Sequence, residues 1–369
     1  MREEREIAGF ALPFVAGTLI SAYISLPSYL DNPLFYGLFS TITFIPLTCL
    51  IHPMHLQWSD WTLKSIIACT GMLCGFTIGA RGMPMNLYSE WNIGFLEMHT
   101  GQLGGLIRNS IKGIPFSDKE TNAIISALLT GDRSGIPIET IQTFRSSGAS
   151  HILALSGLHL GIIYSMLQKI LSLSGNSIYA TRFRSVMIIL TCFLYTMATG
   201  AGESITRALL FIIIGETARS LGRKISIRNI FFCALVIQLT YSPLSCRSAG
   251  FQLSYAAIAG IAFIYPWFNG LWKGGHSRFN PIARIWKSAA ISISCQMTTG
   301  PLAWLWFGSL PKYCILTNLI AVPLAGLIIP CSIITIILHS FGVCPEIITR
   351  ATECLVSTLT DALEIISLM

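Results

Sequence analysis

Residues 314–338, CILTNLIAVPLAGLIIPCSIITIIL, contain no charged side chain. A helix of about 20 apolar residues crosses the hydrocarbon core of a bilayer, which is roughly 30 Å thick. In lipid, only helices and closed barrels satisfy all of their backbone hydrogen bonds. The short alternating segments typical of a barrel are not visible in this sequence. The stretch therefore predicts a membrane-spanning helix, and it decides the fold class.

Similar apolar stretches recur along the whole chain. Only 11% of the 369 residues are charged while 53% are hydrophobic, a balance that is not typical of a water-soluble domain of this size. We expect an all-α integral membrane protein, a polytopic bundle of about ten transmembrane helices. The expected spans lie near residues 8–26, 33–51, 63–80, 150–172, 184–200, 204–221, 228–243, 249–268, 288–308 and 314–338.

Basic residues indicate the orientation of the spans. The loops after the fourth, sixth and eighth spans are rich in Lys and Arg, and the short loops between them carry few. Short basic loops stay in the cytoplasm. We therefore expect a cytoplasmic N-terminus, with Arg2 and Arg5, and a long segment at 81–149 on the outer face.

The outer segment at 81–149 has its own helical patterns. Residues 96–114 carry apolar side chains at helical spacing, which predicts an amphipathic helix at the membrane surface. Ser117 and Glu120 match a capping box that opens another helix, and GDRSG at 131–135 predicts a turn.

The expected organisation has four parts. An amphipathic helix at the C-terminus is expected to lie on the membrane or to pack peripherally, because it carries several charges. The parts are a three-helix membrane segment at 1–80, the outer segment at 81–149, a transmembrane core at 150–345 and the C-terminal helix at 346–369.

Small residues predict close helix packing. Gly71, Gly75 and Gly79 recur every four residues in the third span, and such spacing lets helix backbones touch in lipid. We interpret the eleven cysteines as packing residues, because they form no CxxC motif and most fall inside spans. The seven histidines are scattered, so neither a metal nor another cofactor is expected.

Ionisable side chains inside a span are costly and mark a pathway or a partner. Glu203 and Arg207 lie four residues apart in the sixth span, with the acid nearer the N-terminus. This spacing puts them on one face of a helix in the favourable order. Two interpretations stay open: a self-neutralising structural pair, or an arginine that Glu203 holds towards an aqueous path used by an anion.

The fourth span opens with HILALSGLHLGI at 151–162. Ser156 and His159 are three residues apart and share a face, and Gly157 leaves room beside them. One interpretation is a buried hydrogen-bonding pair that holds a broken helix. The other is the nucleophile and base of a membrane-embedded hydrolase or ligase, although no third orienting carboxylate accompanies the pair.

Two other spans also carry polar groups. Gln252 and Ser254 lie in the eighth span, and Asn318 lies in the tenth. Each can act as interhelical glue. Together with the fourth and sixth spans they suggest one shared polar interior. A transporter of an anion or of a lipid-linked solute that uses Arg207 is a further alternative.

Four stretches occur in a fixed order: LLTGDRSGIPIETIQTFRSSGASHILALSGLHLGI at 128–162, AGESITRALL at 201–210, SAGFQLSYAAIAGI at 248–261 and TNLIAVPLAG at 317–326. Together they resemble the competence domain of the ComEC-type DNA-uptake channels of competent bacteria. The motif residues carried over by position are Asp132, Arg133, Arg145, Ser156, His159, Arg207, Gln252 and Asn318.

The resemblance implies a channel in the bacterial inner membrane that passes single-stranded DNA into the cytoplasm during natural transformation. It also implies an outer-face DNA receptor protein and a cytoplasmic helicase-like motor as partners. Larger members carry OB-like and metallo-β-lactamase-like domains without counterparts in this sequence, so we expect no enzymatic activity here. Either separate proteins, including a nuclease, supply those functions, or the sequence is a shortened form. A DNA strand needs a wet, mildly cationic lining, for which Arg207 is the intramembrane candidate.

Overall fold

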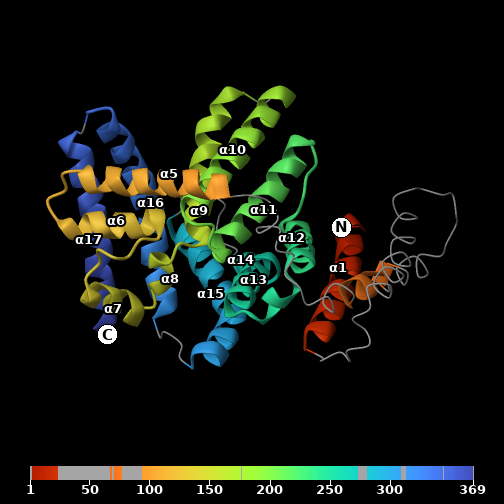
Figure 1. The fold of residues 1–369 in the computed structure, drawn as a ribbon. Coiled ribbons are helices and arrows are strands. Elements are labelled where there is room, and N and C mark those ends of the chain that lie inside the picture. Colours follow the sequence, from red (N-terminus) through yellow and green to blue (C-terminus); the bar gives the residue numbers. More distant parts are fainter. Residues whose placement is uncertain are drawn as a thin grey trace. The chain divides into compact units, whose positions relative to one another are not determined.

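The computed structural model describes residues 2–23, 67–68, 70–76, 94–175, 177–272, 281–308, 313–343 and 345–368. Over these residues the chain is helical and contains no β-strand (Figure 1). The chain divides into two compact units. The first comprises Met1–Asn92 and Lys224–Tyr255, and the second comprises Ile93–Arg223 and Ala256–Met369. The predicted second span at 33–51 lies outside the described residues.

The all-helical class predicted from the sequence is confirmed for the described residues. Three of their helices are long and apolar enough to cross a membrane: Ile178–Ala198, Ala249–Leu271 and Cys314–Ser340. Two shorter apolar helices run over Ile7–Ile20 and Ile227–Tyr241. Each of the five overlaps a predicted span, but the number of about ten spans stays a prediction.

The first unit is built on two long helices that pack against each other. They are α1 (Arg2–Tyr23) and α12 (Ile227–Tyr241). A short 3₁₀ turn, η3 (Pro243–Arg247), leads from α12 to α13 (Ala249–Ala259). Ser248 opens α13, because its hydroxyl accepts a hydrogen bond from the backbone N–H of Phe251 at 3.2 Å.

Glycines of the predicted third span pack tightly against α1. A Cβ atom placed on Gly71 would collide with the carbonyl oxygen of Phe10, and one placed on Gly75 would collide with that of Phe14. The two helices therefore touch through their backbones, as the glycine spacing predicts. Gly79 lies outside the described residues.

The second unit contains the remaining elements. The helical run from α13 continues through a π-turn, η4, and here Gly260 lies against the carbonyl oxygen of Ser294. The elements are α5 (Gly94–Gly113), α6 (Lys119–Thr130), α7 (Ile138–Ser146), α8 (Ser150–Leu153), α9 (Gly157–Leu171), η2 (Ser172–Ser174), α10 (Ile178–Ala198), α11 (Glu203–Ser220), η4 (Gly260–Ile264), α14 (Tyr265–Leu271), α15 (Pro281–Phe307), α16 (Cys314–Ser340) and α17 (Glu346–Ser367).

The predicted outer segment forms part of the hydrophobic core of this unit. Helices α5 and α6 lie side by side (Figure 1), and both also contact α16. Ile111 and Ile114, which the sequence assigns to a membrane-surface face, are buried. The apolar half of α6 is buried in the same cluster as residues of α16 and α17. The apolar pattern therefore serves packing against helices at its C-terminal end, whereas Leu103 earlier in α5 is exposed.

The predicted capping box at Ser117 is wrong by one residue. Asp118 is the N-cap of α6, and its carboxylate accepts the backbone N–H of Glu120 at 3.0 Å. Ser117 instead donates its backbone N–H to the carboxylate of Glu353 on α17. Ser117 therefore bonds to the distant Glu353, and the neighbouring Asp118 caps the helix, which an aspartate does as well as a serine.

The glycine contacts in the first unit generate a prediction. Gly75→Val should lower both membrane abundance and the melting temperature in detergent, because a side chain cannot fit against the Phe14 carbonyl. Gly9→Val is the matched control on α1, where an added Cβ would meet no atom within 4 Å. Equal abundance and melting of the two variants would show that the tight contact does not matter.

Candidate functional site

The GDRSG stretch forms the predicted turn after α6. Gly131 ends the helix in the left-handed conformation, with φ of 77°. The carboxylate of Asp132 accepts hydrogen bonds from the hydroxyl of Ser134 at 2.7 Å and from its backbone N–H at 3.0 Å. These bonds, and more weakly the charges of Arg108 and Lys112, hold the pKa of Asp132 below its ordinary value. Asp132 thus stabilises the turn as a carboxylate.

The other basic motif residues differ in their surroundings. Arg133 donates its Nε–H to the carbonyl oxygen of Leu153 at 3.0 Å, and so ties the turn to the end of α8. A separate hydrogen bond joins the end of α7 to α16, because the hydroxyl of Thr317 on α16 donates to the carbonyl oxygen of Ser147 at 2.6 Å. Arg145, in the last turn of α7, is exposed. Arg133 therefore has a structural contact, whereas Arg145 is open to a partner.

Ser156 and His159 form a capping box at the start of α9. The Ser156 hydroxyl accepts the backbone N–H of Leu158 at 3.3 Å, and His159 Nδ1 accepts the backbone N–H of Ser156 at 3.1 Å. Ala154 and Ser156 are extended, so the helical segment predicted near 150–172 is interrupted between α8 and α9. The capped break supplies the hydrogen bonds that an interrupted helix needs.

The geometry of His159 bears on the hydrolase interpretation. Its ring is fully buried, and within the described part of the chain Nε2 has no hydrogen-bond partner. A catalytic histidine needs an orienting group on the nitrogen remote from the serine. Here Nδ1, which lies 3.1 Å from the Ser156 hydroxyl, also receives the backbone N–H. The arrangement supports the interpretation as a buried pair that holds a broken helix.

The start of α9 packs against the first turns of α11. A Cβ placed on Gly157 would lie 3.1 Å from the Cβ of Ala208, so only a glycine fits easily here. Helix α11 begins directly after a tight turn in which Ala201 has a φ of 47°. The contact brings the Ser156 cap and the Glu203–Arg207 pair to the same end of the two helices.

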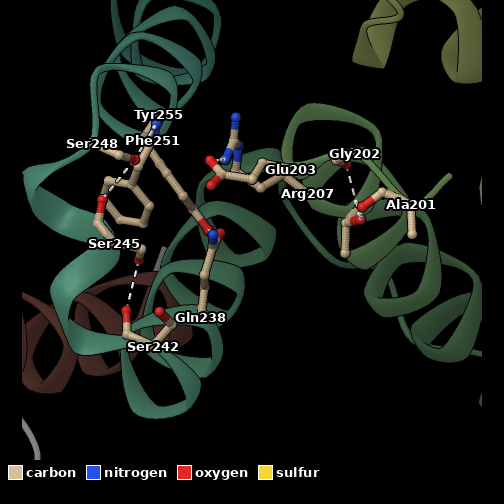
Figure 2. A network of polar contacts seen from close by, with 11 residues as sticks. Ala201, Gly202, Glu203, Arg207, Gln238, Ser242, Ser245, Ser248, Phe251 and Tyr255 are labelled. Atoms are coloured by element: carbon tan, nitrogen blue, oxygen red, sulfur yellow. Dashed lines mark hydrogen bonds and ion pairs between the residues drawn. The ribbon is translucent and has the colours of Figure 1, made fainter. Parts of the chain in front are cut away.

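Glu203 and Arg207 lie on one face of α11, as predicted (Figure 2). Their Oε2 and Nη1 atoms are 3.4 Å apart. The two side chains differ sharply in exposure, 72% for Glu203 and 4% for Arg207. The cationic group is therefore held inside the protein, while the acid that pairs with it is largely exposed.

The motif residues of the predicted eighth span belong to the first unit. Gln252 donates its side-chain N–H to the carbonyl oxygen of Cys246 at 2.9 Å. One turn later, the hydroxyl of Tyr255 donates to Oε1 of Gln238 at 2.8 Å (Figure 2). Ser254, between them, is half-buried. These bonds join α13 to η3 and α12, as expected of interhelical glue.

Asn318 lies in the first turns of α16, in the second unit. Its Nδ2 is 3.7 Å from Cys314 Sγ, and its buried Oδ1 has no hydrogen-bond partner in the described ranges. The structure thus brings together Ser156, His159 and the Glu203–Arg207 pair. A single polar interior shared by all four spans stays a prediction.

A buried acid outside the predicted site residues lies near the other end of α11. Glu216 is fully buried. Its carboxylate accepts hydrogen bonds from the Tyr164 hydroxyl and the Gln168 amide of α9, and from the Ser185 hydroxyl of α10, each at 2.8 Å. The guanidinium of Arg219 contacts the same carboxylate. Four donor groups from three helices therefore converge on one buried carboxylate.

The sequence held a signal for this network. Glu216 and Arg219 are spaced as neighbours on a helix face, as are Tyr164 and Gln168. All four fall in the last turns of predicted spans, where polar residues usually mark only the membrane boundary. The network ties three helices together at that end.

A family model described as "Competence protein" matches residues 128–369, a range that contains every candidate residue discussed above. The chain belongs to the competence protein family.

Two relatives illustrate the relationship. ComE operon protein 3 of Bacillus subtilis (strain 168) is 31% identical over 138 residues, which make up 37% of this chain and 17% of that protein. Competence protein ComA of Neisseria gonorrhoeae is 26% identical over 290 residues, which make up 75% of this chain and 39% of that protein. The chain thus spans well under half of either relative. No solved structure matches it.

The buried network generates a prediction. Glu216→Ala should lower the unfolding free energy by about 2–3 kcal/mol, because it leaves Tyr164, Gln168 and Ser185 without their acceptor. Glu346→Ala is the control, since that acid is 77% exposed in its ion pair, and should cost less than about 1 kcal/mol. Unfolding by denaturant in mixed micelles measures both, and equal losses would contradict a stabilising role for the network.

Proposed function

We propose that this protein passes a single DNA strand across the bacterial inner membrane into the cytoplasm during natural transformation. The observation that carries the proposal is the competence family match over residues 128–369. Membership in that family indicates a role in DNA uptake. The helices long enough to cross a membrane support a location in the bilayer.

Arg207 is the residue that we assign to the path of the strand. It is held inside the protein on α11, and its partner Glu203 is largely exposed. Because the Glu203 carboxylate is largely exposed, a passing phosphate can compete with it for the guanidinium and replace it as the anionic partner. The acid then returns when the phosphate moves on. Such an exchange gives a polyanion a contact that is favourable but weak enough to leave.

The orientation and partners complete the proposal. With a cytoplasmic N-terminus, Arg145 of α7 would lie on the outer side, where its exposed side chain would be available to incoming DNA. An outer-face receptor would deliver the DNA, a helicase-like motor would pull the strand from the cytoplasm, and a separate nuclease would degrade the other strand.

A second candidate uses the same observation. A buried arginine with an exposed acid suits any anion, so transport of a small anion or of a lipid-linked solute follows from the same geometry. Loss of DNA uptake without loss of solute accumulation separates the channel from this transporter.

Substitutions at Arg207 test its assignment to the path. Arg207→Lys should keep part of the transformation frequency, because a phosphate accepts a point charge, whereas Arg207→Gln should abolish uptake even where the protein inserts normally. The double variant Arg207→Gln with Glu203→Gln should also fail. Membrane abundance and transformation frequency are measured for each.

Arg350→Gln is the matched control, because Arg350 pairs with Glu346 at the same four-residue spacing but both side chains are exposed. It should leave abundance and uptake unchanged. If Arg207 only neutralises Glu203, the single Arg207→Gln variant loses abundance and the double variant regains both abundance and uptake. Full uptake in the double variant would therefore refute the path role.

A further inference from the structure

Helix α17 packs along α16, so the two helices lie at the same depth in the membrane. The hydroxyls of Thr335 on α16 and Thr352 on α17 are 3.3 Å apart and buried. Further along, Leu359 and Leu363 of α17 are buried in the same cluster as Ile328 of α16. A later residue on one helix thus packs near an earlier residue on the other. The two helices therefore run antiparallel over several turns.

The apolar sequence of α16 fixes the depth of this pair. It is uncharged from 314 to 338 and long enough to cross the bilayer. Its outward side chains are apolar as well, with Leu327 54% exposed and Ile334 43% exposed. This apolar face of α16 can therefore contact the acyl chains of the lipids. A helix beside α16 lies in the same layer of the membrane.

The outward face of α17 does not suit acyl chains. Glu346 and Arg350 form an ion pair at 2.8 Å with both side chains largely exposed. The exposed polar residues beyond this pair are Cys354, Ser357, Thr358, Asp361 and Glu364, whereas the exposed apolar residues Ile347, Ile365 and Leu368 lie near the two ends of the helix. The pair is neutral, so Asp361 and Glu364 leave the face with net negative charge. Each charge facing hydrocarbon would cost several kcal/mol.

Neighbouring elements extend this polar surface. Helix α7 packs against α17 and exposes Glu139 and Gln142. On the other side, Glu353 of α17 is bound to the backbone N–H of Ser117, before α6. The polar face is therefore held in place by the apolar core on one side and lies open on the other.

We propose that the outward face of α17 lines a water-filled cleft of net negative charge that reaches membrane depth beside α16. This inference rests on α16 crossing the membrane and not on the proposed function. It assigns a second aqueous region to the protein, distinct in charge from the surroundings of Arg207.

Cys354 is a native reporter in this cleft, because it is a free and exposed cysteine on α17. Wild-type protein in native membranes is treated with a cationic trimethylammonium methanethiosulfonate or with its anionic sulfonate counterpart. Modification of Cys354 is followed by peptide mass spectrometry. Both reagents should react, and the cation should react at least about threefold faster. Asp361→Asn should reduce that preference.

Ile334→Cys is the control at matched depth, since it neighbours Thr335, the partner of Thr352. It should resist both charged reagents and react only with an uncharged, membrane-permeant maleimide. A Cys354 that is as unreactive as Ile334→Cys would mean that lipid, another protein or a second copy covers the face, and would overturn the proposal. So would equal rates for the two charged reagents at Cys354, or rapid reaction of both at Ile334→Cys. None of these readouts depends on DNA uptake.

Discussion

A polar or charged group buried among helices needs a partner inside the protein or a route to water, and this constraint organises the second unit. Glu216 meets it with four donors from three helices. Arg207 meets it with an acid on its own helix. The break before α9 meets it with the cap formed by Ser156 and His159. Polar groups that look functional in the sequence often hold helices in place.

The two ends of α11 differ in how their charged side chains are held, and this difference bears on the proposed path. At one end Arg207 is buried but its acid is exposed, so the proposed exchange of the acid for a phosphate takes place there. At the other end Glu216 is fully buried and saturated with donors, so that end is fixed. An apolar stretch, Ala208 to Gly215, separates them. A path along α11 would therefore combine one exchangeable cationic contact with a rigid frame of α9, α10 and α11.

Helix type and position could be predicted from the sequence because apolar length alone carries that information. The predicted spans at 184–200 and 204–221 correspond to α10 at 178–198 and α11 at 203–220. Contacts between distant segments could not be predicted. The sequence pattern predicts that Ser117 caps the helix that follows it, but its hydrogen-bond partner is Glu353, which lies 236 residues away in sequence. Likewise, the sequence shows the helical spacing of Glu216 with Arg219 and of Tyr164 with Gln168. The sequence does not show that these two pairs contact each other.

The most direct test of the central claim is to locate DNA in cells that lack this protein. Labelled DNA is offered to competent parental cells and to the deletion strain, and nuclease-resistant label in the cytoplasm is separated from label at the cell surface. The account predicts that the deletion strain binds DNA at its outer face but holds no label in the cytoplasm, and that re-expression of the protein restores entry. Cytoplasmic entry at the parental rate without the protein would contradict it.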